Sequence, residues 1–176
     1  GFSMGRKTVD KCALPEPGTA TASTAADPRQ FCSYTVPNEA LAQIKISGSY
    51  PMPYGLQVSA TYLNQPGIPI SALYSLPNSA VFPALGRNLA SCGATVTCTA
   101  AKTIQLIEPF TQFEDRLTKV DVRVSKSIRA GRLRIQPRLD LYNLFNANTV
   151  TSINPTFGPA FRRPLSILDG RFAKVG

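Results

Sequence analysis

Four cysteines are the residues of this sequence best suited to covalent chemistry. They stand in two separate stretches that are rich in Ala, Thr, Ser, Pro and Gly, as loops are: Cys12 and Cys32, and Cys92 and Cys98. Of the three possible pairings, nearness along the chain favours Cys12–Cys32 and Cys92–Cys98 disulfides, which indicate an oxidising compartment. The spacing from Cys92 to Cys98 is too wide for a CxxC-like pair of zinc ligands. A zinc site and four free thiols are the alternatives.

The sequence offers no recognisable set of catalytic residues. It contains no His, which removes His-based acid–base catalysis and most zinc, copper and haem sites. It contains no phosphate-binding GxxxxGK[ST] or GxGxxG loop either. The adjacent carboxylates of Glu114 and Asp115 diverge in an extended chain, so they do not form an acid–base pair. We therefore expect no enzymatic activity and no cofactor.

The charge pattern is unusual for a water-soluble domain. The net charge is +9, yet charged residues make up only 16% of the chain, against about 25% in soluble domains. Either most of the chain is covered or its outer surface does not face water. A positive net charge suggests an anionic partner, but no nucleic-acid motif accompanies it, so no nucleic acid is expected. Most basic residues are scattered, and the exceptions are Arg129, Arg132, Arg134 and Arg138, and Arg162–Arg163.

Apolar and polar residues alternate with a period of two in four segments. Because successive side chains of a strand point to opposite faces, this alternation indicates two-faced strands. Gln43–Tyr50 and Leu56–Tyr62 predict one hairpin, and Val120–Ile128 and Arg132–Leu141 predict a second. Pro137 costs the second hairpin one ladder hydrogen bond, which weakens the strand only locally.

The rest of the chain adds weaker strands and no helical pattern. Phe2–Val9 and Gly170–Gly176 are short candidate strands. No window has apolar residues at helical spacing, and no run of 18 apolar residues could form a transmembrane helix. No signal peptide is recognisable, and the first residue is Gly1 rather than Met, so the true start is expected upstream. The chain is therefore expected to be all-β.

Short and long connections alternate along the chain. The turns at Pro51–Gly55 and Ala130–Gly131 are tight, whereas residues 10–40, 65–118 and 147–169 form long connections. In an antiparallel up-and-down meander, this order gathers the short turns at one end and the long loops at the other. A transmembrane β-barrel has this asymmetry, and its apolar outer face accounts for a low charge content. A soluble β-sandwich with its apolar faces inward is the alternative.

Three segments of the C-terminal third form a distinctive series: the strand Val120–Ser127, the turn Ala130–Arg132 and the segment Asp140–Asn146, which reads Asp-Leu-Tyr-Asn-Leu-Phe-Asn. In these residues the C-terminal third resembles the end of the barrel in TonB-dependent outer-membrane receptors. The sequence is most similar to the Oar-like subgroup, in which a carboxypeptidase-regulatory-like domain precedes the plug and the barrel. The further matches lie within 41–176 and are Ser47–Pro51, Pro66–Ile70, Leu85–Leu89, Phe113–Arg116 and Gly170–Arg171.

The resemblance implies that residues 1–176 are the C-terminal portion of an outer-membrane β-barrel and supply about six strands of a larger transmembrane barrel. Barrels of the family end in an aromatic residue, whereas this sequence ends at Gly176 and includes no plug or TonB box, so a fragment is expected. The implied function is uptake of an unidentified solute across the outer membrane of a Gram-negative cell. The implied partners are outer-membrane lipid, the extracellular solute and the TonB complex, which acts through the plug.

The resemblance also assigns roles to the alternating side chains. Residues of the apolar face would meet lipid, namely Ile44, Val58, Val122 and Leu139. Tyrosines near the tight turns would form an aromatic girdle at the membrane interface: Tyr50, Tyr54 and Tyr62. Candidate lumen-facing residues either line the solute path or are simply solvated, and they are Lys45, Arg123, Arg132, Arg134, Arg138 and Asp140.

The long loops would carry specificity. Within residues 65–118, Ile68–Tyr74 and Lys102–Ile107 are expected to pair as a small hairpin that the Cys92–Cys98 disulfide clips. Asn143 and Asn146 are expected to end their strand by turn chemistry. A surface or adhesion barrel without transport and a soluble carbohydrate-binding sandwich are the alternative functions. Candidate binding residues lie beyond the hairpin, where a salt-bridged loop is favoured over a metal site: Glu108, Glu114, Asp115 and Arg116.

Overall fold

The computed structural model describes residues 1–10, 12, 31–93 and 97–176, which form mainly β-structure. The expectation of an all-β chain is therefore corrected to a mainly β chain with a few short helices. The longest helix has eight residues and contains Pro83, so it is too short for an apolar stripe to stand out in the sequence. The helices are α1 (Asn38–Leu41), α2 (Asn78–Leu85) and the 3-10 turns η1 (Pro53–Gly55) and η2 (Ala90–Cys92).

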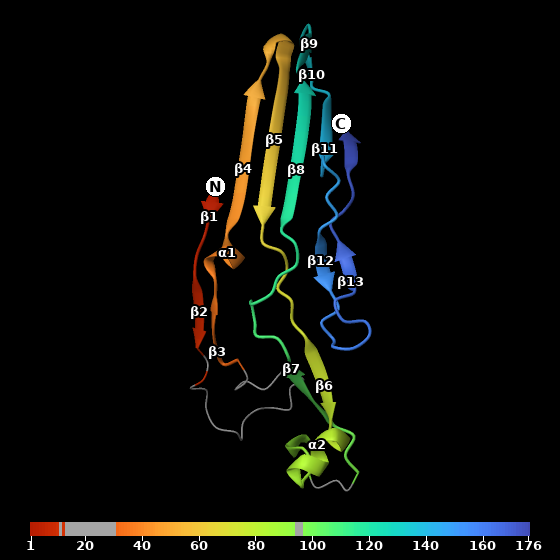
Figure 1. The fold of residues 1–176 in the computed structure, drawn as a ribbon. Helices are drawn as coiled ribbons and strands as arrows, with labels where there is room; N and C mark the ends of the chain where they lie inside the picture. The colour runs from red at the N-terminus through yellow and green to blue at the C-terminus, as the bar shows by residue number, and fades with distance from the viewer. Residues whose placement is uncertain (11, 13–30, 94–96) are drawn as a thin grey trace.

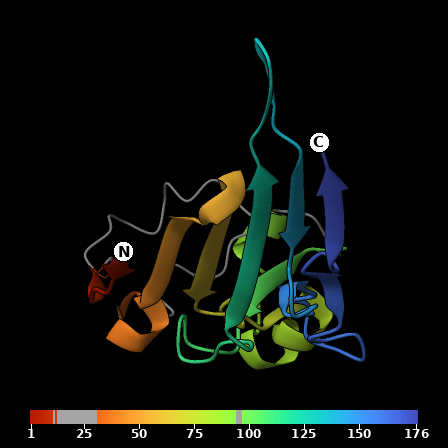
Figure 2. The same ribbon diagram turned by 90° about the horizontal axis from the view of Figure 1, so that it is seen from above.

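Six strands form one antiparallel sheet in which neighbours along the chain are neighbours in space (Figure 1). They are β1 (Phe2–Ser3), β4 (Gln43–Pro51), β5 (Leu56–Gln65), β8 (Leu117–Lys126), β11 (Arg138–Tyr142) and β14 (Phe172–Val175). The predicted six-strand antiparallel meander is confirmed. Within the described residues the sheet is open, because its edges β1 and β14 do not pair with each other. Figure 2 shows these edges on opposite sides of the molecule.

Both predicted hairpins form, and each closes in a tight turn. β4 and β5 are joined through η1, where Tyr54 and Gly55 have φ angles of 63° and 70°. Beyond β8 the chain forms β9 (Ile128–Ala130), which pairs with β10 (Leu133–Ile135) before the chain returns as β11. Pro137 separates β10 from β11, and its carbonyl still accepts a hydrogen bond from the Lys126 N–H at 3.0 Å. The proline therefore interrupts the strand only locally, as predicted.

Each long connection folds back on itself as a two-stranded hairpin. The pairs are β2 (Lys7–Asp10) with β3 (Ser33–Val36), β6 (Leu73–Pro77) with β7 (Ala101–Gln105), and β12 (Val150–Ile153) with β13 (Pro164–Ile167). All three lie beyond the same end of the sheet, away from η1 and β9–β10 (Figure 1). We call the end that carries the three hairpins the loop end, and the end that carries η1 and β9–β10 the turn end. The asymmetry predicted from the connection lengths is therefore present.

The hairpin within residues 65–118 is displaced from its predicted position. β6 begins at Leu73, which pairs with Gln105, so the first strand lies further along the chain than Ile68–Tyr74. Ile68 is bonded elsewhere, since its carbonyl accepts the Glu114 N–H at 3.0 Å. Pro69 follows directly and has no N–H to contribute to a ladder. The prediction of a hairpin was correct, and its first strand was placed too early.

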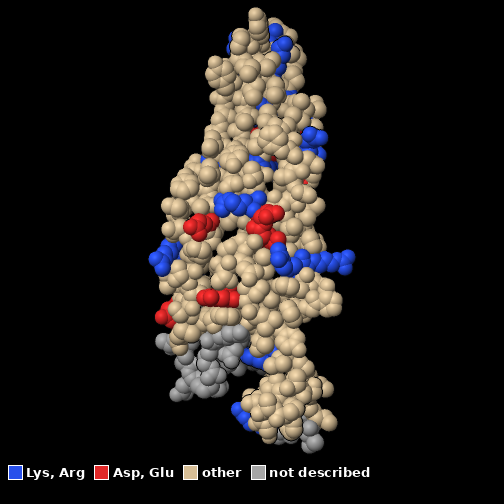
Figure 3. All heavy atoms as spheres, in the orientation of Figure 1, with Lys and Arg blue, Asp and Glu red and all other residues tan. Residues whose placement is uncertain are grey.

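The two faces of the sheet differ chemically, as the alternation predicts. The register sets up an apolar row across five strands: Tyr50, Val58, Val124, Leu139 and Val175. This face is uncovered, since Tyr50 is 69% exposed and Val175 is 79% exposed. Figure 3 shows Lys and Arg atoms at the upper tip of the molecule, mostly uncharged atoms below them, and the Asp and Glu atoms lower, towards the loop end. The sheet thus presents a broad apolar surface.

The buried core lies at the loop end rather than under the sheet. In the described residues its apolar members are Val36, Ala40, Ile70, Ala72, Cys92 and Ile153. They come from the long connections and not from the six strands. The three long connections therefore pack against one another, and none of the described residues forms an apolar layer over either face of the sheet.

Two of the three tyrosines expected near the tight turns lie there. Tyr50 ends β4 and Tyr54 lies in η1, so both are at the turn end. Tyr62 pairs with Ile46 and with Val120, towards the loop-end half of β5. Its inclusion with the other two was wrong, because the register of β5 carries it away from the turn.

Candidate functional site

The polar face of the sheet carries a row of side chains parallel to the apolar row. It crosses five strands and consists of Ser49, Ser59, Arg123, Asp140 and Lys174. These residues share a face because each lies directly opposite the next in the register. The sheet itself, rather than a loop, therefore positions this set.

An ion pair forms the centre of this row. The Arg123 Nε contacts the Asp140 carboxylate, and the Arg123 Nη2 donates to Asp140 Oδ2 at 3.1 Å. Asp140 is only 4% exposed. A two-point guanidinium–carboxylate contact fixes both side chains more firmly than a single contact would. Arg123 therefore neutralises the one carboxylate buried in this part of the polar face.

Two shallow hollows flank the ion pair. One has a volume of about 310 Å³ and includes Gln57, Ser125 and Arg138 in its lining. The other has a volume of about 270 Å³ and reaches Asp121 and Tyr142. Both include Ser59 and Arg123. These hollows offer amide, hydroxyl and guanidinium donors to a polar solute, with Arg123 between them.

The predicted lumen-facing residues do not all gather in one place. Three of them, Arg123, Arg138 and Asp140, meet around the hollows. Lys45 is exposed on β4 and pairs with Leu63, away from that set. Arg132 and Arg134 belong to the β9–β10 hairpin, where the Arg134 Nε donates to Ser127 Oγ at 3.0 Å. The register places Arg123 opposite Asp140 on one face of the sheet, whereas Arg132 lies in the turn before β10. Alternation alone does not show which residues meet across strands.

Two of the four predicted loop-binding residues, Glu114 and Arg116, fix the loops to one another and to the sheet. Glu114 pairs with Arg162 Nη2 at 2.9 Å, which joins the second long connection to the third. Arg116 Nη2 donates to the Ala42 carbonyl at 2.6 Å and to Asn64 Oδ1 at 2.8 Å. Glu108 and Asp115 are exposed, and the Glu108 carbonyl accepts the Thr111 hydroxyl at 2.8 Å. The four residues form no common pocket.

Further contacts draw the three long connections together at the loop end. Tyr34 and Phe110 stack with their ring centroids 5.8 Å apart, and Tyr74 meets Phe157 edge-on at 6.2 Å. The Leu73 N–H donates to the Pro155 carbonyl at 2.8 Å. The second long connection therefore contacts both the first and the third.

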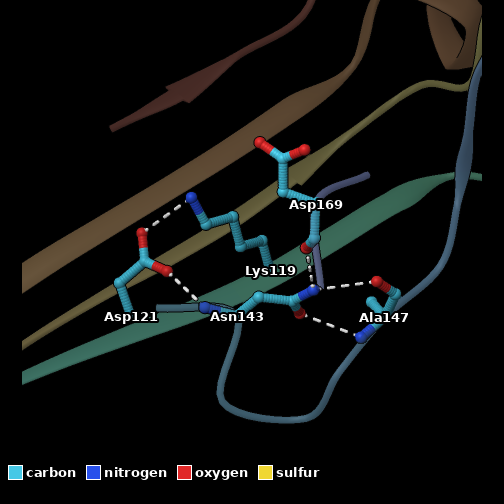
Figure 4. Close-up of polar contacts among 5 residues, drawn as sticks. All are labelled: Lys119, Asp121, Asn143, Ala147 and Asp169. Carbon is cyan, nitrogen blue, oxygen red and sulfur yellow. Dashed lines mark hydrogen bonds and ion pairs between the residues drawn. The ribbon is translucent and has the colours of Figure 1, made fainter. Parts of the chain in front are cut away.

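Asn143, just beyond β11, has a role that sequence analysis captured only in part (Figure 4). Its Nδ2 donates to the carbonyls of Ala147 and Asp169, each at 2.8 Å, and its Oδ1 accepts the Ala147 N–H at 2.9 Å. Its own N–H donates to Asp121 Oδ1, and Lys119 Nζ contacts the other oxygen of that carboxylate, Oδ2, at 3.1 Å. Asn143 and Asn146 have φ angles of 50° and 54°, so they form the expected turn. The sequence did not predict its hydrogen bonds to Asp121 and Asp169.

The structure joins Cys12 to Cys32 and Cys92 to Cys98, the pairing favoured by nearness along the chain. The second disulfide lies in the segment that connects β6 to β7. Across the described ranges, no three Cys, Asp or Glu side chains gather where they could hold a metal ion. None of the helices in those ranges has the length and apolar character needed to cross a membrane.

The chain was compared with protein-family models, curated proteins and solved structures, and none of them matched.

Proposed function

We propose that this chain is part of the barrel of a TonB-dependent outer-membrane receptor of the Oar-like subgroup, which takes up an unidentified solute. The observation that carries the proposal is the two-faced sheet, whose apolar row of Tyr50, Val58, Val124, Leu139 and Val175 is uncovered while the opposite row is polar. In a transmembrane barrel, the apolar face meets lipid and the polar face meets a wet lumen.

The open sheet edges fit the same proposal. An isolated edge strand leaves its N–H and C=O groups unpaired, which is untenable in lipid. In the described residues, β1 and β14 are such edges. Further strands on both sides would complete the barrel, so we propose that these six strands belong to a larger one.

The lengths of the connections at the two ends of the sheet give the proposed orientation in the membrane. Outer-membrane barrels have short periplasmic turns and long extracellular loops. The turn end would therefore face the periplasm, and the loop end, with its three hairpins, would meet the solute. The polar row with Arg123 and Asp140 would line the lumen, and the TonB complex would act through a plug domain.

A surface or adhesion barrel without transport is the second candidate. The contacts that draw the long connections together favour it, because Tyr34–Phe110, Tyr74–Phe157 and Glu114–Arg162 build a continuous surface suited to a macromolecular partner. A soluble sandwich is disfavoured, since it would need a second layer over the apolar row, and no part of the described chain supplies one.

The test is to read the coding DNA outward from both ends of the segment that encodes this chain. A plug domain and TonB box upstream, with a final aromatic residue downstream, are the expected result. Barrel strands without a plug would favour the adhesion protein. Start and stop codons directly flanking the segment would contradict the barrel proposal, since six strands are too few to enclose the polar face seen here.

A further inference from the structure

The turn end carries a basic hairpin that the proposed transport function does not use. We define it as residues 126–138, with β9 and β10 at its tip. No Asp or Glu occurs between Asp121 and Asp140. The hairpin's basic residues are Lys126, Arg129, Arg132, Arg134 and Arg138, and all five are exposed. Figure 2 shows the hairpin extending beyond the rest of the sheet. It therefore places a local positive charge away from the remaining surface.

The register makes this hairpin amphipathic. Arg129 lies directly opposite Arg134, whereas Ile128 lies opposite Ile135 and Ala130 opposite Leu133. Like charges directly opposite each other destabilise a strand pair. Arg134 donates to the neutral Ser127 hydroxyl, which does not compensate that charge. An anion on this face would stabilise the hairpin.

The other face of the hairpin is aliphatic and open. Ile128, Leu133 and Ile135 are 42%, 69% and 54% exposed. They share one face of the hairpin, because Ile128 lies opposite Ile135 and Leu133 stands two residues before Ile135 in the same strand. The hairpin therefore offers guanidinium groups on one side and exposed aliphatic groups on the other.

We propose that the basic hairpin docks on an anionic phospholipid surface. Guanidinium groups bind phosphates well, and an amphipathic element with Arg on its polar face lies stably at the boundary between headgroups and acyl chains. Nucleic acid fits less well, because residues 122–139 contain no aromatic side chain on which a base could stack. This inference goes beyond the proposed function, since it concerns lipid headgroups at the turn end rather than the solute path.

The test is co-sedimentation of the full chain with two kinds of vesicle: phosphatidylcholine alone, and equal parts of phosphatidylcholine and phosphatidylglycerol. The anionic vesicles are expected to bind at least tenfold more tightly. Each basic group near an anionic surface contributes about fivefold in affinity. The Arg129→Gln/Arg134→Gln variant should therefore bind the anionic vesicles about twenty-five-fold more weakly and bind the neutral vesicles as before.

The matched control is Arg87→Gln/Arg163→Gln, which removes the same charge from exposed positions outside the basic hairpin. It should retain most of the preference for anionic vesicles. Equal losses in the two double variants would overturn the proposal, since net charge alone would then explain binding. No preference for anionic vesicles would overturn it as well. Displacement of the chain from the vesicles by a DNA duplex at equal phosphate concentration would point to nucleic acid instead.

A reporter separates this inference from the proposed function. The chain has no Trp, so Leu133→Trp places a single fluorophore on the aliphatic face of the hairpin. Brominated acyl chains should quench it only in the anionic vesicles. Quenching at position 133 without quenching of an Ile46→Trp reporter on the sheet would support hairpin docking while contradicting the barrel. Quenching at position 46 with none at position 133 would overturn hairpin docking alone.

Discussion

Arg123 on β8 and Asp140 on β11 lie directly opposite each other, and the guanidinium contacts the carboxylate at two points. This pair joins two strands of the polar face, and both hollows lie beside it. Because Asp140 is nearly inaccessible, its carboxylate is hydrogen-bonded by the Arg123 guanidinium rather than by bulk water. The pair therefore combines a structural role with a position in the candidate site.

Arg123→Gln is expected to destabilise the chain, because it leaves the Asp140 carboxylate without its guanidinium partner. The thermal midpoint should fall by several degrees, as measured by circular dichroism. Lys45→Gln is the matched control, since Lys45 is an exposed cation on the same face of the sheet, and it should leave the midpoint nearly unchanged. Equal midpoints for the two variants would show that the ion pair contributes nothing to stability.

Asn143→Ala is expected to lower the free energy of unfolding by about 3 kcal/mol. The change removes three side-chain hydrogen bonds. It also places Ala at a left-handed backbone position, which Asn tolerates better. Asn143→Gly keeps the backbone freedom and should cost about 1 kcal/mol less. Urea titration measures both, with the exposed Asn148→Ala as control. A loss no larger than that of the control would contradict the assigned role.

Gly67→Ala is expected to destabilise the loop end. A Cβ at this position would lie 2.0 Å from the Glu114 carbonyl oxygen and 2.5 Å from that of Asp115, both of them backbone atoms. Overpacking of this kind costs about 1–3 kcal/mol. Gly48→Ala is the control, since a Cβ there meets nothing within 4 Å. Thermal unfolding should separate the two variants clearly, and similar midpoints would mean that the chain does not approach so closely at Gly67.

The two disulfides are expected to differ in their contribution to stability. Their cysteines are separated by 20 and 6 residues, and a longer closed loop restricts the unfolded chain more. Loop-closure entropy gives about 3 kcal/mol for Cys12–Cys32 and about 2 kcal/mol for Cys92–Cys98. Paired Cys→Ser variants, compared by urea titration under non-reducing conditions, test the order. A larger loss at the shorter loop would contradict the entropic explanation.

The sequence predicted the strands well because alternation and turn residues are local signals. Gln43–Tyr50 and Leu56–Tyr62 differ from β4 and β5 by only a few residues at their ends. The sequence predicted the long connections less well, because their structure depends on short helices and on contacts between residues far apart in the chain. Helix α2 is too short to show a periodic pattern. The first strand of the loop hairpin begins only at Leu73, because Ile68–Ile70 are bonded to residues 112–114 instead.

The candidate site shows the same division. Alternation gave the face of Arg123, Arg138 and Asp140, but only the register of β8 against β11 brings Arg123 onto Asp140. Glu114 and Arg116 were grouped as binding residues because they are close in sequence. Their partners, Arg162 and Asn64, lie in other connections and strands, and no local pattern points to them.

The central claim is that one face of the six-stranded sheet meets lipid and the other meets water. It is tested most directly by two single-Trp variants at neighbouring positions of β4, Ile46→Trp and Ser47→Trp, in a chain with no other Trp. Both variants are made in the complete barrel that the proposal requires, with any Trp outside this segment replaced by Phe. After reconstitution in phosphatidylcholine vesicles, Ile46→Trp should be quenched by brominated acyl chains and Ser47→Trp by aqueous acrylamide. Equal accessibility of both positions to acrylamide, with no acyl-chain quenching of either, would contradict the barrel account.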